Sequence, residues 1–303
     1  MNPTLKDLEK GVLPMAFFFL CVLWGQFFLA LWPTWSELAT YRYAFVAAPL
    51  MLFFVYRRWD LSQGLKRSVS YSKLSRVLML GTVFLVLMPL FLIRPLQLVD
   101  SFWRMPLWLH AVSVLLVTFL TFFLTVGWER VRLMLPAFLL AFVLVPLPSS
   151  VENELVGSLT GAVSNLVGEL LPLTGYPVDR FGNTMIVKGA MLDVAEGCSG
   201  IRSFQASFMT GLYLGEFYQH GVLHRLLLVG AAILLALLGN TARIYFLTTT
   251  AFNHGMEKES QIHETVGVFT LVFIYGAIGL IAWLFGQDAF RFGGKLVRRE
   301  VIS

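Results

Sequence analysis

Three residues in the C-terminal half of the chain carry reactive side chains within largely apolar sequence. Cys198 lies in EGCSGIR (196–202), Arg243 ends GNTAR (239–243) and His263 begins HETVG (263–267). A thiol becomes a strong nucleophile where neighbouring positive charge favours the thiolate. Imidazole can transfer a proton to a leaving group, and a fixed guanidinium can stabilise a developing oxyanion. These residue types together predict a thiol acyl-transfer site.

Polar neighbours of these three residues are candidates for supporting or substrate-binding roles. Arg202 lies one helical turn beyond Cys198, where it either supplies the charge that favours the thiolate or extends toward lipid headgroups. The other supporting candidates are Glu196, Ser199, Asn240 and Glu264. No Cys and His pair has the spacing of metal ligands, so we expect neither a metal nor a cofactor.

The elements that carry these residues must be membrane spans. Hydrophobic residues make up 57% of the 303 residues and charged residues 14%, against about 45–50% and about 25% in soluble domains. This excludes a soluble globular protein and indicates an all-α polytopic membrane protein. A span needs about 20 mostly apolar residues, which predicts eight spans at about 12–32, 39–56, 77–93, 105–126, 133–148, 200–218, 226–250 and 264–286.

Basic residues set the expected orientation of the spans. The segment 57–76 contains six Lys and Arg residues and one acid, so it should be cytoplasmic. With eight spans both termini are then cytoplasmic, and the five inner segments hold 15 of the 23 basic residues. The net charge of +5 therefore reflects topology and contact with anionic lipids, and we expect no nucleic-acid partner.

The same topology brings the three reactive residues to one side of the membrane. Cys198 enters the sixth predicted span from outside, and His263 lies at the outer start of the eighth. Arg243 lies 17 residues beyond Leu226, a rise of about 26 Å in a helix, so it also approaches the outer face. Arg243 is the hardest of the three to explain structurally, because an arginine inside an apolar span is rare without a partner.

The segment between the fifth and sixth predicted spans is the longest outside the membrane. Apolar residues recur with helical period from Val151 to Leu171, Ser149 and Glu152 form a capping box, and Pro172 follows. We expect an amphipathic helix on the membrane surface. Turn residues at 182–183 and 188–189 then predict a small hairpin with strands 184–187 and 191–194. The expected regions are residues 1–148, 149–196, 197–290 and a basic cytoplasmic tail, 291–303.

Other reactive side chains receive structural interpretations. Cys21 lies in the middle of the first predicted span and is expected in the core. The remaining histidines are expected to be anchors at the membrane interface; they are His110, His220, His224 and His254.

Four blocks in order resemble the exosortase/archaeosortase family of membrane cysteine transpeptidases: GYPVDRFGN (175–183), LDVAEGCSGIRS (192–203), NTARI (240–244) and HETVG (263–267). The resemblance implies a catalytic triad of Cys198, Arg243 and His263. It also implies substrates, namely exported proteins with a C-terminal signal made of a short Pro-containing motif such as Pro-Glu-Pro, a transmembrane helix and a basic tail. Cleavage would occur on the outer face of a bacterial or archaeal cytoplasmic membrane.

The expected mechanism is an acyl-enzyme on Cys198, with Arg243 stabilising the oxyanion and His263 protonating the departing amine. An amine of a lipid or saccharide would complete transfer, whereas water would give hydrolysis. Two alternatives stay open: a transporter in which Arg243 binds an anionic substrate, and an inactive substrate-binding relative. The transporter is disfavoured because the polar residues lie toward one face of the membrane.

Overall fold

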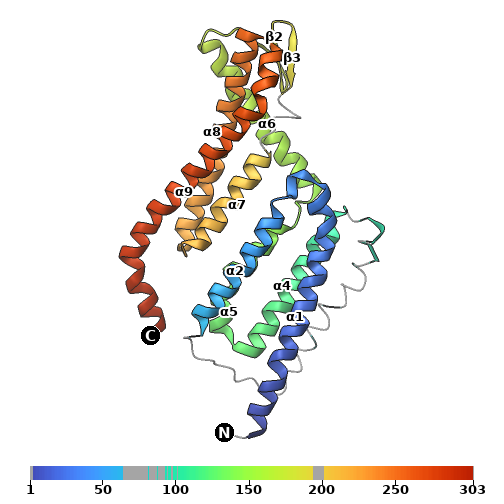
Figure 1. Cartoon of the computed structure of the whole chain (residues 1–303), viewed down its shortest axis with the longest axis vertical. Helices are drawn as coiled ribbons and strands as arrows, with labels where there is room; N and C mark the ends of the chain where they lie inside the picture. Colours follow the sequence, from blue (N-terminus) through green and yellow to red (C-terminus); the bar gives the residue numbers. More distant parts are fainter. Residues whose placement is uncertain are drawn as a thin grey trace. The chain divides into compact units, whose positions relative to one another are not determined.

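The computed structural model describes residues 3–63, 102–193 and 201–302, with several isolated positions between 81 and 100. The chain divides into two compact units, residues 1–148 and 149–303. Apart from a small sheet in the second unit, the described elements are helices (Figure 1). The predicted all-α polytopic membrane fold is confirmed.

The first unit is a packed set of helices. Its elements are α1 (Pro3–Glu37), η1 (Ala39–Tyr41), α2 (Ala44–Ser62), α4 (Arg104–Val126), α5 (Trp128–Leu139) and η2 (Leu140–Leu144). Indole N–H groups link distant segments: Trp24 donates to the Thr118 hydroxyl at 3.0 Å, and Trp35 donates to the Leu144 carbonyl at 3.0 Å. Such bonds give the polar end of the buried Trp35 and of the half-buried Trp24 a partner within largely apolar surroundings.

The second unit contains a small sheet and the longest helices. Its elements are α6 (Ser149–Leu173), β1 (Asp179–Phe181), β2 (Thr184–Val187), β3 (Ala190–Asp193), α7 (Ile201–Phe217), α8 (Val222–His254) and α9 (Met256–Ile302). Figure 1 shows α8 and α9 running side by side with α7 next to them, and β2 and β3 near the end where α8 leads into α9. A core between α8 and α9 contains Leu228, Ala232, Ile274, Ile278 and Ala282.

Five described helical segments are long and apolar enough to cross a membrane, and a sixth is counted if Trp128–Leu144 and Ser149–Leu173 form one span. The predicted number of eight is not confirmed. Three predicted spans are missing from this number for different reasons. The span 77–93 lies almost wholly outside the described residues. The span 133–148 is interrupted where α5 changes to η2, and α7, which corresponds to the span 200–218, is short at 17 residues. The five segments are Phe17–Glu37, Ala39–Ser62, Arg104–Val126, Val222–His254 and Met256–Gly286.

The predicted amphipathic helix is confirmed as α6, but much of its apolar face contacts protein. Val163, Val167 and Leu171 are buried and pack in one cluster with Ile244 and Leu247 of α8. Burial of apolar side chains stabilises this pairing at roughly 25 cal/mol per Å² of buried apolar area. Part of the apolar face therefore contacts protein, whereas Leu166 and Leu170 stay exposed, and the placement of the helix on the membrane surface stays a prediction.

The predicted hairpin is confirmed as part of a three-stranded antiparallel sheet. Phe181 pairs with Thr184, and Val187 pairs with Ala190, which leaves two residues in each turn. Lys188 (φ 49°) and Gly189 (φ 83°) both have positive φ, as a two-residue type I′ turn requires. The additional strand β1 was not predicted, and predicted strand residue 194 lies outside the described residues.

His220, between α7 and α8, is buried, so its interpretation as an interfacial anchor is wrong. Its Nε2 lies 3.2 Å from the Ala282 carbonyl oxygen of α9. A carbonyl only accepts, so Nε2 carries the proton and Nδ1 is the bare nitrogen of a neutral ring. Burial lowers the pKa of His220 below 6.5, His224 and Arg225 lower it further, and the bond to Ala282 partly opposes this.

We expect acidification to destabilise the second unit through His220. Because its folded-state pKa is lowered, the unfolded chain binds the proton first, so stability is retained above about pH 6.5 and falls as the pH drops below that value. Thermal unfolding at about pH 7.5 and about pH 5.5 should show this fall, and His220→Gln should reduce it. His254→Gln, at an exposed histidine, is the control. Equal pH dependence in wild type and His220→Gln would contradict the prediction.

Candidate active site

The predicted site residues are described to different extents. The structure does not describe residues 194–200, so Cys198, Glu196 and Ser199 lie outside the described part of the chain. Arg202 belongs to the first turn of α7, although its side chain is not described. The described candidates on α8 are Asn240 and Arg243, and those on α9 are His263 and Glu264.

A close approach of α8 and α9 brings their polar residues together. A Cβ atom built on Gly239 would lie 2.7 Å from Ile274 Cδ1, which is too close for any side chain larger than hydrogen without movement of Ile274. Gly239 lies one turn before Arg243. The glycine therefore allows α9 to pass close to α8 at the level of the candidate site.

The Arg243 guanidinium lies against Gly267 of α9. A Cβ atom built on Gly267 would lie 3.2 Å from Arg243 Nη2 and 3.3 Å from its Cζ. Gly267 follows His263 by four residues, so the two positions lie on the same side of α9. The guanidinium and the imidazole are thus carried at neighbouring levels, about one helical turn apart along α9.

One nitrogen of Arg243 has no hydrogen-bond acceptor among the residues that the structure describes. The side chain is half-buried, and its Nε is buried and makes no hydrogen bond within that part of the chain. A buried donor without an acceptor costs about 1–3 kcal/mol. The arginine is therefore suited to bind a group that carries an oxygen acceptor or a negative charge.

His263 is oriented by a carboxylate that the sequence analysis did not select. His263 Nδ1 lies 2.8 Å from Glu259 Oε1, one turn earlier on α9, and Glu259 is buried. An ionised carboxylate only accepts hydrogen bonds, so Nδ1 carries a proton and Nε2 is left to exchange one. By contrast, the predicted supporting residue Glu264 is exposed. The signal in the sequence that could have identified this pair is the spacing of four residues between Glu259 and His263, which places both on one face of a helix.

Helix α6 and the sheet support α8 beside the site. Ile244, next to Arg243, is buried in a cluster with Val163, Val167 and Leu171 of α6 and Met185 of β2. Ile262 and Val266 of α9, which flank His263, pack against the same cluster. The backbone on both sides of the site is thereby held by a core shared between four elements.

The described arrangement can supply two catalytic functions. Arg243 offers a developing negative charge a guanidinium whose buried Nε–H has no acceptor in the described part of the chain, and His263 offers an oriented Nε2 for proton transfer. These features define a multi-pass membrane protein with an arginine and histidine site between two helices.

The transmembrane exosortase family model matches residues 35–282, which is most of the chain and covers part of each structural unit. The chain therefore belongs to the transmembrane exosortase family. Family membership supports a membrane transpeptidase-type role with exported proteins as substrates. Searches of curated proteins and of solved structures find no match to the chain.

Proposed function

We propose that this exosortase is a cysteine transpeptidase that cleaves a C-terminal sorting signal on exported proteins and transfers them to an acceptor. The signal would consist of a short Pro-containing motif, a transmembrane helix and a basic tail. The observation that carries the proposal is the position of the Arg243 guanidinium against Gly267, one turn from His263. A charge-stabilising group and a proton donor at neighbouring levels are the two groups that a thiol nucleophile needs.

The proposed reaction begins with attack of the Cys198 thiolate on the carbonyl carbon at the sorting motif. Arg243 stabilises the negative charge on the tetrahedral oxyanion. His263 Nδ1 already carries the proton that faces Glu259, so Nε2 is the nitrogen that takes the proton of the Cys198 thiol as the thiolate forms. As the C–N bond breaks, Nε2 gives that proton to the departing amine, while Glu259 keeps the ring oriented. The product is a thioester on Cys198, which an amine of a lipid or saccharide then attacks to complete transfer.

The site is proposed to face the outside of a bacterial or archaeal cytoplasmic membrane, with both termini inside. The basic segment 57–76 supports this orientation through the positive-inside rule. The substrate would then reach the site after export, and its own transmembrane helix would lie beside α7, α8 and α9.

The experiment that tests the proposal is capture of the acyl-enzyme. The protein is co-expressed with an exported reporter that ends in a Pro-Glu-Pro motif, a helix and a basic tail, and Cys198 peptides are analysed by mass spectrometry. We expect a thioester to the reporter at Cys198, absent in Cys198→Ala and accumulating when acceptor is withheld. Exported proteins encoded beside the gene serve as second reporters. If none of these substrates is shortened or attached, the proposal fails, and a transporter with Arg243 as anion site is favoured.

Gly267→Ala should impair processing although residue 267 carries no reactive group. The new methyl group would meet Arg243 Nη2 at 3.2 Å and displace the guanidinium by a few tenths of an ångström. We expect about a tenfold loss of reporter cleavage, because small misplacements of catalytic groups are costly. Gly276→Ala on the same helix is the matched control, since nothing lies within 4 Å of its Cβ position. Equal cleavage by both variants would refute the role given to Arg243.

A further inference from the structure

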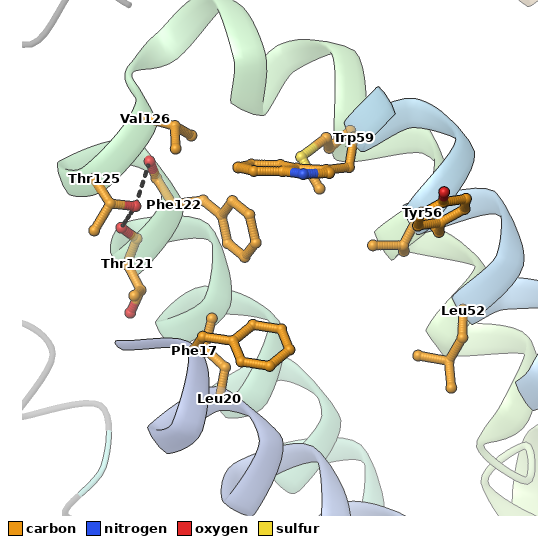
Figure 2. Close-up of a pocket in the computed structure, with 11 residues that line it drawn as sticks. Phe17, Leu20, Leu52, Tyr56, Trp59, Thr121, Phe122, Thr125 and Val126 are labelled. Atoms are coloured by element: carbon orange, nitrogen blue, oxygen red, sulfur yellow. Dashed lines mark hydrogen bonds between the residues drawn. The ribbon is translucent and has the colours of Figure 1, made fainter. Parts of the chain in front are cut away.

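The first unit contains a cavity of about 490 Å³ between α1, α2, α4 and α5 (Figure 2). This volume lies within the range of about 300–1,000 Å³ that is typical of small-molecule sites. The cavity belongs entirely to the first unit, whereas Arg243 and His263 belong to the second. Nothing in the proposed reaction uses it.

The walls of the cavity are mainly hydrocarbon. Figure 2 shows aromatic rings of Phe17, Trp59 and Phe122 around its space. The Thr125 hydroxyl donates to the Thr121 carbonyl at 2.8 Å, so this polar group is already satisfied by its own helix. A ligand in the cavity would therefore be held by apolar contact.

Among the residues that the structure describes, one side of the cavity is closed and the other is open. Leu20, Val126 and Met134 form a buried floor. Phe17 of α1 and Tyr56 of α2, in contrast, are both 68% exposed. Both helices are long and apolar enough to span the membrane, so the opening between them faces the lipid bilayer.

The size of the cavity excludes a helix as its occupant. A helix with side chains is about 10–12 Å wide and rises about 5.4 Å per turn. A volume of 490 Å³ therefore holds only about one turn. The transmembrane helix of a sorting signal cannot fit, whereas a flexible hydrocarbon chain can.

Arginines gather where the cavity-lining segments end. Arg57 and Arg58 lie between Tyr56 and Trp59 in α2, and Arg58 Nη1 donates to the Leu133 carbonyl of α5 at 2.5 Å, beside Met134. Arg130 and Arg132 lie four and two residues before Met134 in α5, and Arg132 forms an exposed ion pair with Glu129 at 3.3 Å. The positive-inside rule places these residues at the cytoplasmic leaflet, where anionic headgroups are found.

We propose that this cavity binds one acyl chain of an anionic phospholipid, whose headgroup lies near the arginines of α2 and α5. The apolar wall selects the chain, the lateral opening admits it from the bilayer, and the arginines select the headgroup charge. The proposal is independent of the transpeptidase reaction, and it makes the first unit a lipid-binding part of the enzyme.

The test is photocrosslinking of the full-length protein in phosphatidylethanolamine vesicles that contain phosphatidylglycerol with a diazirine midway along one acyl chain. We expect adducts concentrated in peptides covering 52–59 and 121–126, and competition by unlabelled phosphatidylglycerol. Leu52→Trp should lower this labelling about tenfold by filling the cavity. Leu50→Trp is the matched control, because Leu50 is on the same helix and does not line the cavity. Val55→Trp serves as a second filling variant if Leu52→Trp does not fold.

Four results would overturn the proposal or its headgroup assignment. Labelling that is spread over all spans and does not saturate would indicate bulk lipid only. Equal labelling of the filling variants and Leu50→Trp would exclude the cavity as the site. If excess phosphatidylethanolamine or a polyprenol competed as effectively as phosphatidylglycerol, an anionic phospholipid would be excluded as the preferred occupant of the cavity. The combined variant Arg57→Gln with Arg130→Gln should reduce the preference for phosphatidylglycerol, and an unchanged preference would contradict the headgroup assignment.

Discussion

Replacing Arg243 with glutamine is expected to lower reporter cleavage by about 10²–10³-fold, the usual cost of removing one oxyanion donor. The buried Nε of Arg243 has no acceptor within the described residues, so replacing the side chain breaks no hydrogen bond between that atom and this part of the chain. The loss should therefore fall on the reaction, in kcat, and leave thermal stability near that of wild type. Single-turnover cleavage of purified protein in detergent measures it.

Two further variants define the role of Arg243. Arg243→Lys retains the charge without the planar fork, so intermediate activity would mean that both charge and geometry contribute. Arg42→Gln removes an exposed arginine from the first unit and should leave cleavage unchanged. Wild-type cleavage by Arg243→Gln would eliminate the oxyanion role.

Glu259→Gln is expected to lower kcat by about 10²-fold or more, because a misoriented or wrongly protonated imidazole is costly in related proton-transfer sites. The glutamine amide can donate to Nδ1 as well as accept from it, so it no longer fixes the tautomer that leaves Nε2 for proton transfer. Substrate affinity should change little, since Glu259 contacts the histidine and is buried. The split between kcat and KM, measured on one reporter, distinguishes this positioning role from a binding role.

The matched control for Glu259→Gln is Glu257→Gln, an exposed acid in the same first turn of α9. Glu257→Gln should retain wild-type kcat. Equal effects of the two substitutions would mean that the charge of the helix N-terminus matters and the contact with His263 does not. A parallel loss of thermal stability in Glu259→Gln would instead indicate a structural role.

The sequence predicted those helices and turns that are determined by residues close together in the chain. Apolar runs predicted the long helices, and the pairs at 182–183 and 188–189 predicted the two turns of the sheet, as the register confirms. The strand β1 was missed because Asp179, Arg180 and Phe181 are all exposed, so no alternation of apolar and polar residues marks it. Pairing with β2, and not its own composition, makes this segment a strand.

Features that depend on contacts between distant segments could not be predicted in this way. His220 is buried because it bonds to Ala282, 62 residues away, and His110 is likewise buried although it was expected at an interface. Cys21, expected in the core, is exposed, so its assignment is also wrong. Periodicity indicates that a helix has an apolar face, but only packing decides which side contacts protein.

Glu259, His263 and Gly267 follow one another at intervals of four residues on a single helix. Their mutual geometry is fixed by the backbone of α9 alone, whereas the contact of Gly267 with Arg243 depends on two helices. Any sliding of α8 along α9 would separate the guanidinium from the imidazole without disturbing the carboxylate and histidine pair. The carboxylate and histidine pair is thus fixed within one helix, whereas the position of the guanidinium depends on the close approach of α8 and α9 that Gly239 allows beside Ile274.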